Sequence, residues 1–128
     1  MVQVVKAGLA YTLPVFLCAF ALGALRVTLI APALGPVAAV ALEVPVVLTL
    51  SWLIAGPVLR HWPVPMPQRP ALALFAFIVL MLLELGTALT FGQSPAQFLQ
   101  AMTTPAGALG LAGQIGFALI LLIRQASG

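Results

Sequence analysis

The sequence has few charged residues: five basic and two acidic side chains, or 5% of its 128 positions. A soluble domain carries about a quarter charged residues because its surface faces water, so a water-soluble globular domain is excluded. The five basic residues are scattered along the chain and form no cationic cluster, which excludes a nucleic-acid partner. Cys18 is the single cysteine, so the chain forms no internal disulfide.

Residues that ligate metals or act as nucleophiles are equally scarce. One histidine, His61, and one cysteine cannot supply a cluster of metal ligands. The chain also lacks the sequence motifs of zinc metalloproteases, serine hydrolases and phosphate-binding loops. We therefore expect no metal, no cofactor and no enzymatic activity.

Long apolar stretches dominate the chain, with 63% of residues hydrophobic and a mean hydropathy of +1.23. A helix needs about 20 apolar residues to cross the hydrocarbon core of a bilayer. Four stretches meet this length: 7–30, 36–59, 70–91 and 105–123. Proline is favoured in the first turn of a helix, and Pro36, Pro70 and Pro105 stand at three of these starts. The pattern predicts an all-α integral membrane protein, a four-helix bundle with short loops in a single transmembrane domain, 1–128.

A fifth, shorter helix is predicted over 95–102. Ser94 followed three residues later by Gln97 is the capping-box pattern of a helix start. The segment is too short to cross a bilayer, so we expect it to lie at the membrane interface. Thr104 is the expected N-cap of the fourth span.

The positions of the basic residues predict the orientation, because loops on the cytoplasmic side retain positive charge. Lys6 precedes the first span, Arg60 and Arg69 flank the loop between spans two and three, and Arg124 follows span four. The connections 31–35 and 92–104 carry no charge. We expect a protein of the bacterial inner membrane with both termini in the cytoplasm, whose first span is retained and not cleaved as a signal peptide.

Three ionisable side chains lie inside the predicted spans: Arg26, Glu43 and Glu84. At 1.5 Å per residue, all three fall roughly 6 to 11 Å below the outer interface. The short link between spans one and two forces an antiparallel hairpin, which makes Arg26 and Glu43 the expected direct pair. Glu84 is expected as a second acid near the same guanidinium.

This polar cluster has two interpretations. As a structural clamp, the guanidinium ties three helices together in a medium where hydrophobicity does not drive helices to associate. As a working site, it contains two acids against one cation, so one carboxylate is left to exchange a proton or a cation. Arg26 has a further alternative, which is to snorkel to the headgroups. Thr87 lies one turn beyond Glu84 and either donates to it or bonds its own helix.

The fourth span carries small residues on two faces. Gly107, Gly110, Gln114 and Ala118 share one face, and Ala108, Ala112 and Gly116 share the opposite one. We expect the first face to pack against the other spans, with Gln114 donating to a neighbouring helix, and the second to be open to another copy or a partner. The alternative is that both faces pack inside one bundle.

The segments ALGALRVTLIAPALG, ALEVPVVLTLSWLIAGPVLR and TTPAGALGLAGQ resemble a recurring kind of small, uncharacterised four-span bacterial inner-membrane protein. This resemblance implies the topology and no activity. In size and number of spans the chain is also similar to the small multidrug resistance exporters, which act as dimers around a glutamate in their first span. Here the first span carries Arg26, and the glutamates lie in spans two and three.

Two functions are therefore expected. The first is a small membrane protein that acts through helix packing, with the lipid bilayer and either a second copy or a larger membrane complex as its partners. The second is a small proton- or cation-coupled carrier in which Glu43 and Glu84 exchange ions and Arg26 is their counter-charge.

Overall fold

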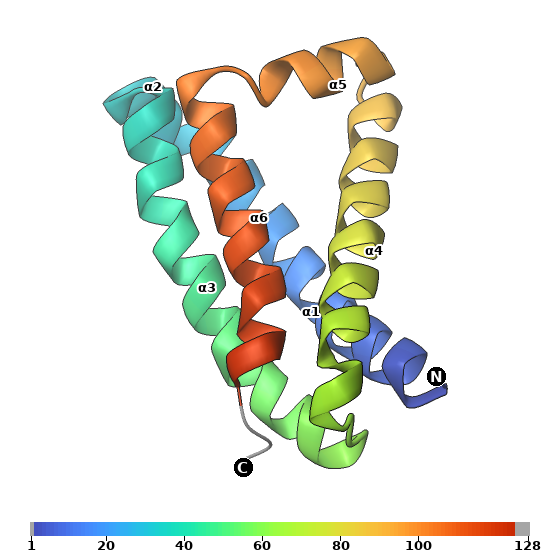
Figure 1. Cartoon of the computed structure of the whole chain (residues 1–128). Coiled ribbons are helices and arrows are strands. Elements are labelled where there is room, and N and C mark those ends of the chain that lie inside the picture. Colours follow the sequence, from blue (N-terminus) through green and yellow to red (C-terminus); the bar gives the residue numbers. More distant parts are fainter. Residues whose placement is uncertain (1, 125–128) are drawn as a thin grey trace.

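The computed structural model describes residues 2–124, which form four long helical segments running alternately up and down (Figure 1). The first segment is continuous through α1 (Val2–Leu25), the π-helical turn η1 (Arg26–Ile30) and α2 (Ala31–Leu34). The other three are α3 (Pro36–His61), α4 (Arg69–Thr90) and α6 (Pro105–Ile123). Two short helices connect them, η2 (Met66–Gln68) and α5 (Pro95–Ala101). No strand occurs in this part of the chain, so the all-α class is confirmed.

Each of the four segments is long and apolar enough to cross a membrane. The first spans Val2–Leu34 and the last Pro105–Ile123, and all four contain a stretch with a mean hydropathy of at least 2.1. Side chains this apolar are stable on a helix surface only when they face hydrocarbon or one another. The predicted four-helix bundle is therefore the observed architecture.

The helix ends follow local capping chemistry. Helices α3 and α6 begin at the expected prolines, Pro36 and Pro105. The capping box of α5 is confirmed, because the Ser94 and Gln97 side chains each accept from the other residue's backbone N–H. The Thr104 hydroxyl accepts from the backbone N–H of Gly107 at 3.0 Å and caps α6 as expected.

The first segment departs from the prediction at its far end. The expected five-residue link 31–35 is helical up to Leu34, and the chain reverses at Gly35, whose φ is +90°. A positive φ of this size is unstrained only for glycine, so Gly35 fixes the reversal point. Ala31, Ala33 and Leu34 are good helix formers and do not stop the helix earlier.

The π-helical turn was not predicted from the sequence. Its hydrogen bond joins the Ala31 N–H to the Arg26 carbonyl, five residues back. Pro32 follows directly; its ring would crowd the carbonyl of Thr28 in a regular α-helix, and it has no N–H to donate. A wider turn before Pro32 relieves this conflict and places Arg26 at the start of the irregular segment.

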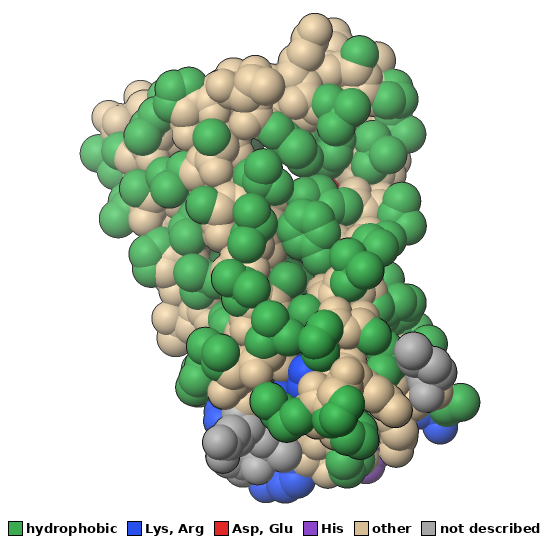
Figure 2. Space-filling model, in the orientation of Figure 1, with side chains coloured by type: hydrophobic (Ala, Val, Ile, Leu, Met, Phe, Trp, Pro, Cys, Tyr) green, Lys and Arg blue, Asp and Glu red, His purple; other side chains and the backbone are tan. Residues whose placement is uncertain are grey.

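The four segments form a ring in which α1 and α6 each pack against both α3 and α4. Lys6, Arg60, Arg69 and Arg124 all belong to the end of the bundle where α1 begins and α6 ends, here called the basic end. Figure 2 shows Lys and Arg side chains gathered at this end on the face in view. The opposite end is the α5 end, where α5 lies across the bundle between α4 and α6 (Figure 1).

The buried core occupies the half of the bundle next to the basic end. Its largest members come from all four long segments: Tyr11, Val15, Leu59, Leu72, Phe117 and Leu121. Beyond Val15 in the first segment and beyond Leu80 in α4, no described residue of these helices is buried. Toward the α5 end, the buried residues of α3 are Ala39 and Val40. The packed core therefore fills only half the length of the bundle.

Arg69 closes the basic end from inside. The side chain is only 7% exposed, and its Nε donates to the Val64 carbonyl at 2.9 Å. Its Nη1 donates to the carbonyls of Leu121 and Arg124, at 3.0 and 2.8 Å. A guanidinium at a helix C-terminus satisfies free carbonyls and complements the helix dipole. Arg69 thus joins the loop after α3 to the end of α6.

Candidate functional site

A cavity of about 910 Å³ lies between the helices in the half of the bundle nearest the α5 end. Its walls come from the first segment, α3, α4 and α6, and residues of α5 and its flanking turns line the end of the cavity. Most of the lining is apolar, and it includes five phenylalanines: Phe16, Phe20, Phe91, Phe98 and Phe117. The polar cluster predicted from the sequence, Arg26, Glu43 and Glu84, lies on these walls together with Gln114.

Arg26 and Glu43 form an ion pair across the first hairpin. Arg26 Nε lies 3.1 Å from Glu43 Oε2, although the contact is not aligned as a hydrogen bond. The Arg26 side chain is 33% exposed and that of Glu43 16% exposed, so the pair is half-buried. A Cβ on Gly23 would lie 3.5 Å from Arg26 Nη2 and 3.9 Å from Glu43 Oε1. Gly23 therefore lies beside the ion pair, and an added methyl group there would make ordinary van der Waals contact with it.

Glu84 has a different partner from the one expected. The Gln114 side-chain amide, on α6, donates to Glu84 Oε2, and the only ion pair of Arg26 within residues 2–124 is with Glu43. Glu84 still lines the same cavity as Arg26 and Glu43. The expected clamp of one guanidinium on two acids is thus replaced by two pairs, because the face that α6 turns toward α4 places the Gln114 amide at Glu84, while the Arg26 guanidinium is held by Glu43.

Gln114 makes the contact expected of it, a donated hydrogen bond to a neighbouring helix. Its amide oxygen is buried and has no partner in the described structure. Thr87 follows the second of its two alternatives, since its hydroxyl donates to the Leu83 carbonyl of its own helix at 2.8 Å. Thr87 lines the cavity without bonding Glu84.

The predicted division of α6 into two faces is partly wrong. Ala108 and Ala112 are exposed, as expected for the outer face. Gly116 was placed on the same face but packs against α3, where its added Cβ would lie 3.0 Å from Leu48 Cδ2. The physical reason is that α6 lies against α3 along Gly113 and Gly116, and Gly113 would meet Val44 Cγ2 at 3.1 Å.

Gly107 and Gly110, the two glycines predicted to pack against the other spans, face the cavity. A Cβ on Gly110 would have Val40 Cγ1 as its nearest neighbour, at 4.0 Å. A Cβ on Gly107 would overlap the carbonyl oxygen of Ala101 at the end of α5, so only glycine fits there. Both glycines line the cavity.

Sequence reasoning missed three contributors to this region: Gly113, Arg69 as an internal cap, and the phenylalanines of the cavity. A signal for Gly113 was present, because Gly110, Gly113 and Gly116 recur every three residues and so follow one side of a helix. No comparable signal marked the phenylalanines, which come from separate segments of the chain.

The donor groups of the cavity define what it can bind. Its ionisable lining residues are Arg26, Glu43 and Glu84, one basic and two acidic. Among the described residues no three His, Cys, Asp or Glu side chains group as metal ligands. The site can therefore hold a small molecule with an apolar body and a polar or charged group. Comparisons of this protein with protein families, with curated proteins and with solved structures find no match.

Proposed function

We propose that this protein is a small carrier of the bacterial inner membrane that binds an amphipathic small molecule in the cavity at the α5 end. The observation that carries this proposal is the cavity of about 910 Å³ with Arg26, Glu43, Glu84 and Gln114 on its walls. The carrier couples this binding to a proton or another cation at a carboxylate.

The cavity favours a working site over a structural clamp. Protein interiors are close-packed, and a void leaves its lining without van der Waals partners. A clamp between Arg26 and Glu43 requires no such void, since the two side chains meet directly at 3.1 Å. A bound molecule would supply the contacts that the lining lacks.

Glu84 is the residue proposed to exchange the ion. Arg26 is paired with Glu43, whereas the hydrogen-bond partner of Glu84 is the uncharged amide of Gln114. An ionised carboxylate inside a membrane needs a counter-charge or a proton. Glu84 therefore offers a position where a proton and a cationic group exclude each other, which is the minimum requirement for coupled exchange.

The proposed orientation has both termini and the loop between α3 and α4 in the cytoplasm. It is supported by the position of Lys6, Arg60, Arg69 and Arg124 at one end of the bundle. Single cysteines placed at positions 65 and 93 of a Cys18→Ala variant should be labelled from opposite sides of the membrane. Labelling of both from the same side would contradict the four-span topology.

Binding is tested with three probes of similar shape and different charge: tetraphenylphosphonium, triphenylphosphine oxide and tetraphenylborate. We expect at least one of them to raise the unfolding temperature of the purified protein. Gly110→Phe should abolish the effect, because Gly110 lines the cavity and has no neighbour nearer than 4.0 Å to stop a ring from filling it. Ala112→Phe, on the exposed side of the same helix, is the matched control. Equal stabilisation of both variants, or none of the wild type, would disprove the proposal.

A second candidate function is a packing role, as a homo-oligomer or an accessory subunit of a membrane complex. The observation in its favour is that Ala108 and Ala112 are exposed on α6, where small side chains allow another helix to approach closely. Cross-linking in native membranes should give a defined oligomer or complex that Ala112→Ile disrupts. An uncrosslinked wild type would leave this candidate without support.

A further inference from the structure

We infer that the ligand of this cavity is an amphiphilic organic cation dissolved in the bilayer, which reaches the cavity sideways between α1 and α4. The inference rests on the proposed function and adds to it a chemical class and a route. It is carried by the charge of the lining, by the position of the aromatic rings, and by a second hollow that shares four lining residues with the cavity.

The charge of the cavity lining selects a cation. Arg26 and Glu43 neutralise each other as an ion pair. Glu84 adds a second negative charge, and its hydrogen-bond partner Gln114 is uncharged. No second basic side chain in the described lining balances that charge. With all three groups ionised, the lining carries one net negative charge. A monovalent cation neutralises the site, while an anion doubles the charge that must be kept away from water.

The aromatic rings complete a site for an organic cation. Five phenylalanines line the cavity, and Phe117 forms its floor, 1% exposed and stacked on Tyr11 with ring centroids 4.6 Å apart. Phenylalanine faces attract a cation through their quadrupole and also pack against the apolar groups it carries. A small hydrated ion would use only the carboxylate and would not fill the space between these rings. The lining therefore fits a cation with an apolar body.

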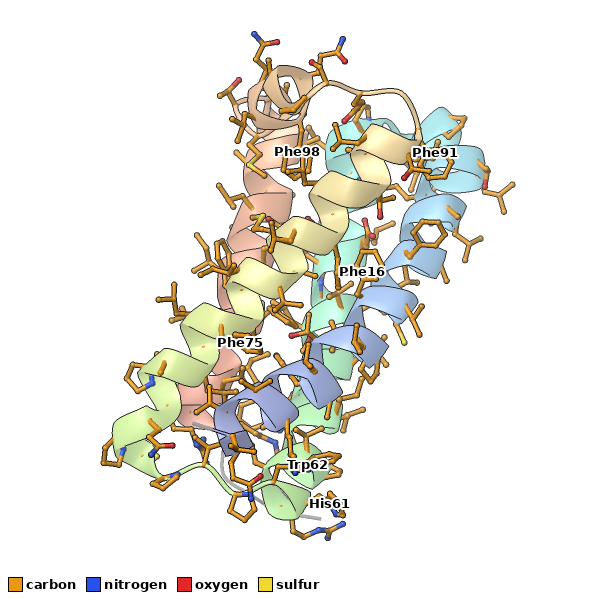
Figure 3. The ribbon with its side chains drawn as sticks, turned by 90° about the vertical axis from the view of Figure 1, so that its right-hand side faces the viewer. Phe16, His61, Trp62, Phe75, Phe91 and Phe98 are labelled. Carbon is orange, nitrogen blue, oxygen red and sulfur yellow. The ribbon has the colours of Figure 1, made fainter. Side chains whose placement is uncertain are left out.

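A second hollow of about 490 Å³ lies along the seam between α1 and α4. Its α1 wall is Phe16 and Phe20, and its α4 wall runs from Leu82 to Thr90, with Phe91 just beyond the helix end. Four of its lining residues also line the main cavity: Phe16, Phe20, Thr87 and Phe91. The two spaces thus share a wall at the seam. Figure 3 shows Phe16 between α1 and α4, on the side of the molecule that faces the viewer.

The seam is closed at one end and open at the other. At the basic end, α1 and α4 touch so closely that a Cβ on Gly8 would overlap the Phe75 ring. Toward the α5 end the two helices diverge (Figure 1), and a Cβ on Gly86 would meet nothing within 4 Å. Phe20 is 47% exposed and Phe91 73% exposed, at the edges of the opening. Phe20 and the α4 wall up to Thr90 belong to apolar segments long enough to cross a membrane, so in the proposed arrangement this opening faces the hydrocarbon of the bilayer.

The first experiment measures the charge preference of the wild-type protein in lipid nanodiscs. Tetraphenylphosphonium should bind more tightly than neutral triphenylphosphine oxide by about tenfold, and tetraphenylborate should bind most weakly. Glu84→Gln should remove the preference for the cation, whereas the matched variant Gln93→Glu, which adds an acid near the opposite end of the cavity wall, should retain it. Tighter binding of the neutral or anionic probe to the wild type would overturn the assigned class.

The second experiment tests the route. A Gly86→Trp side chain fills the outer hollow, because Gly86 lines that hollow but not the cavity. The association rate of tetraphenylphosphonium in nanodiscs should fall about fivefold or more while its equilibrium affinity stays within about twofold, since a blocked path slows binding and release together. Ala112→Trp, which adds the same ring to the exposed side of α6, should leave the rates of association and release of tetraphenylphosphonium unchanged. An unchanged rate in Gly86→Trp would overturn the lateral route.

The binding experiment separates the carrier function from the cationic class of its substrate. If none of the three probes binds the wild type, both the carrier and its substrate class are wrong. If triphenylphosphine oxide or tetraphenylborate binds in the cavity and tetraphenylphosphonium does not, the proposed binding function stands and the cationic class is wrong. The wild-type comparison needs no variant to fold, so a misfolded Glu84→Gln protein does not leave the class untested.

Discussion

The same four helical segments form two regions of different character along their length. Next to the basic end they bury Tyr11, Leu59, Leu72 and Leu121, whose side chains are 0% exposed. Toward the α5 end they enclose a cavity of about 910 Å³. The space beside two glycines differs in the same way. A Cβ added to Gly8 would overlap the Phe75 ring, whereas a Cβ added to Gly86 would have no neighbour within 4 Å.

The two halves of the bundle accommodate charged side chains in different ways. In the packed half, the guanidinium of Arg69 has three backbone carbonyls as acceptors and needs no acid. In the open half, Arg26 and Glu43 remain partly exposed, at 33% and 16%. Buried charges are stable only when every polar atom is satisfied. At Arg69 the packed half supplies the acceptors from its own backbone, whereas the open half leaves room for an outside group.

Arg69→Ala should have the largest effect on stability. The change removes three charge-assisted hydrogen bonds and leaves the carbonyls of Val64, Leu121 and Arg124 without this donor. We expect a loss of about 3 kcal/mol of unfolding free energy, measured by denaturation of the purified protein in mild detergent. Arg60→Ala, an exposed residue of the same end, should cost less than about 0.5 kcal/mol. Similar losses in the two variants would contradict an internal cap.

Gly8→Ala and Gly86→Ala compare the two halves directly. At Gly8 the new methyl group overlaps the Phe75 ring, so the ring or α1 must shift. Overpacking of this kind should lower stability by about 1 to 3 kcal/mol. At Gly86 the methyl group meets open space, and the higher helix propensity of alanine should raise stability by about 0.5 to 1 kcal/mol. Equal responses would mean that the seam between α1 and α4 is no tighter at one end than at the other.

Much of the fold could be predicted because hydrophobic length and proline position are local signals. Pro36, Pro105 and the pair Ser94 and Gln97 each mark a helix start through chemistry within one turn. The reversal at Gly35 was harder to predict, because the segment 31–35 mixes good helix formers with a proline and a glycine and could link two helices in several ways. The π-helical turn depends on how Pro32 is accommodated, which one sequence does not determine.

The residues of the candidate site could be predicted from the sequence, and so could the pair of Arg26 with Glu43, but the partner of Glu84 could not. Arg26, Glu43 and Glu84 could be identified because ionisable residues are rare inside the predicted spans. The geometry of the first hairpin then indicated that Arg26 and Glu43 meet. The partner of Glu84 depended on the rotation of α6 about its own axis, which helical spacing leaves open when small residues occupy two faces. The cavity lies where α1 and α4 diverge (Figure 1), a tertiary property with no local sequence signal.

Arg26→Ala tests the ion pair of the open half. It should lower stability by about 1 to 2 kcal/mol, less than the roughly 3 to 5 kcal/mol of a fully buried pair, because the guanidinium is partly exposed. The double change Arg26→Leu with Glu43→Leu should recover part of this loss, since no unpaired charge remains. Lys6→Ala, at an exposed position of the basic end, is the control. If Arg26→Ala and Lys6→Ala behave alike in thermal unfolding, the pair does not stabilise the fold.

Tyr11→Phe and Thr12→Val probe the boundary between the two halves, where the smallest effects are expected. The Tyr11 hydroxyl donates to the Phe117 carbonyl at 2.5 Å, so its loss should cost about 1 kcal/mol and loosen the floor of the cavity. The Thr12 hydroxyl is buried and has no partner among the described residues. Replacing it with the methyl group of valine removes an unsatisfied polar atom and should leave stability unchanged or raise it by up to about 1 kcal/mol. Both variants keep the shape of the core, so each change in unfolding free energy reports on the hydroxyl that it removes. A larger loss in Thr12→Val than in Tyr11→Phe would mean that the boundary is held by the threonine and not by the tyrosine.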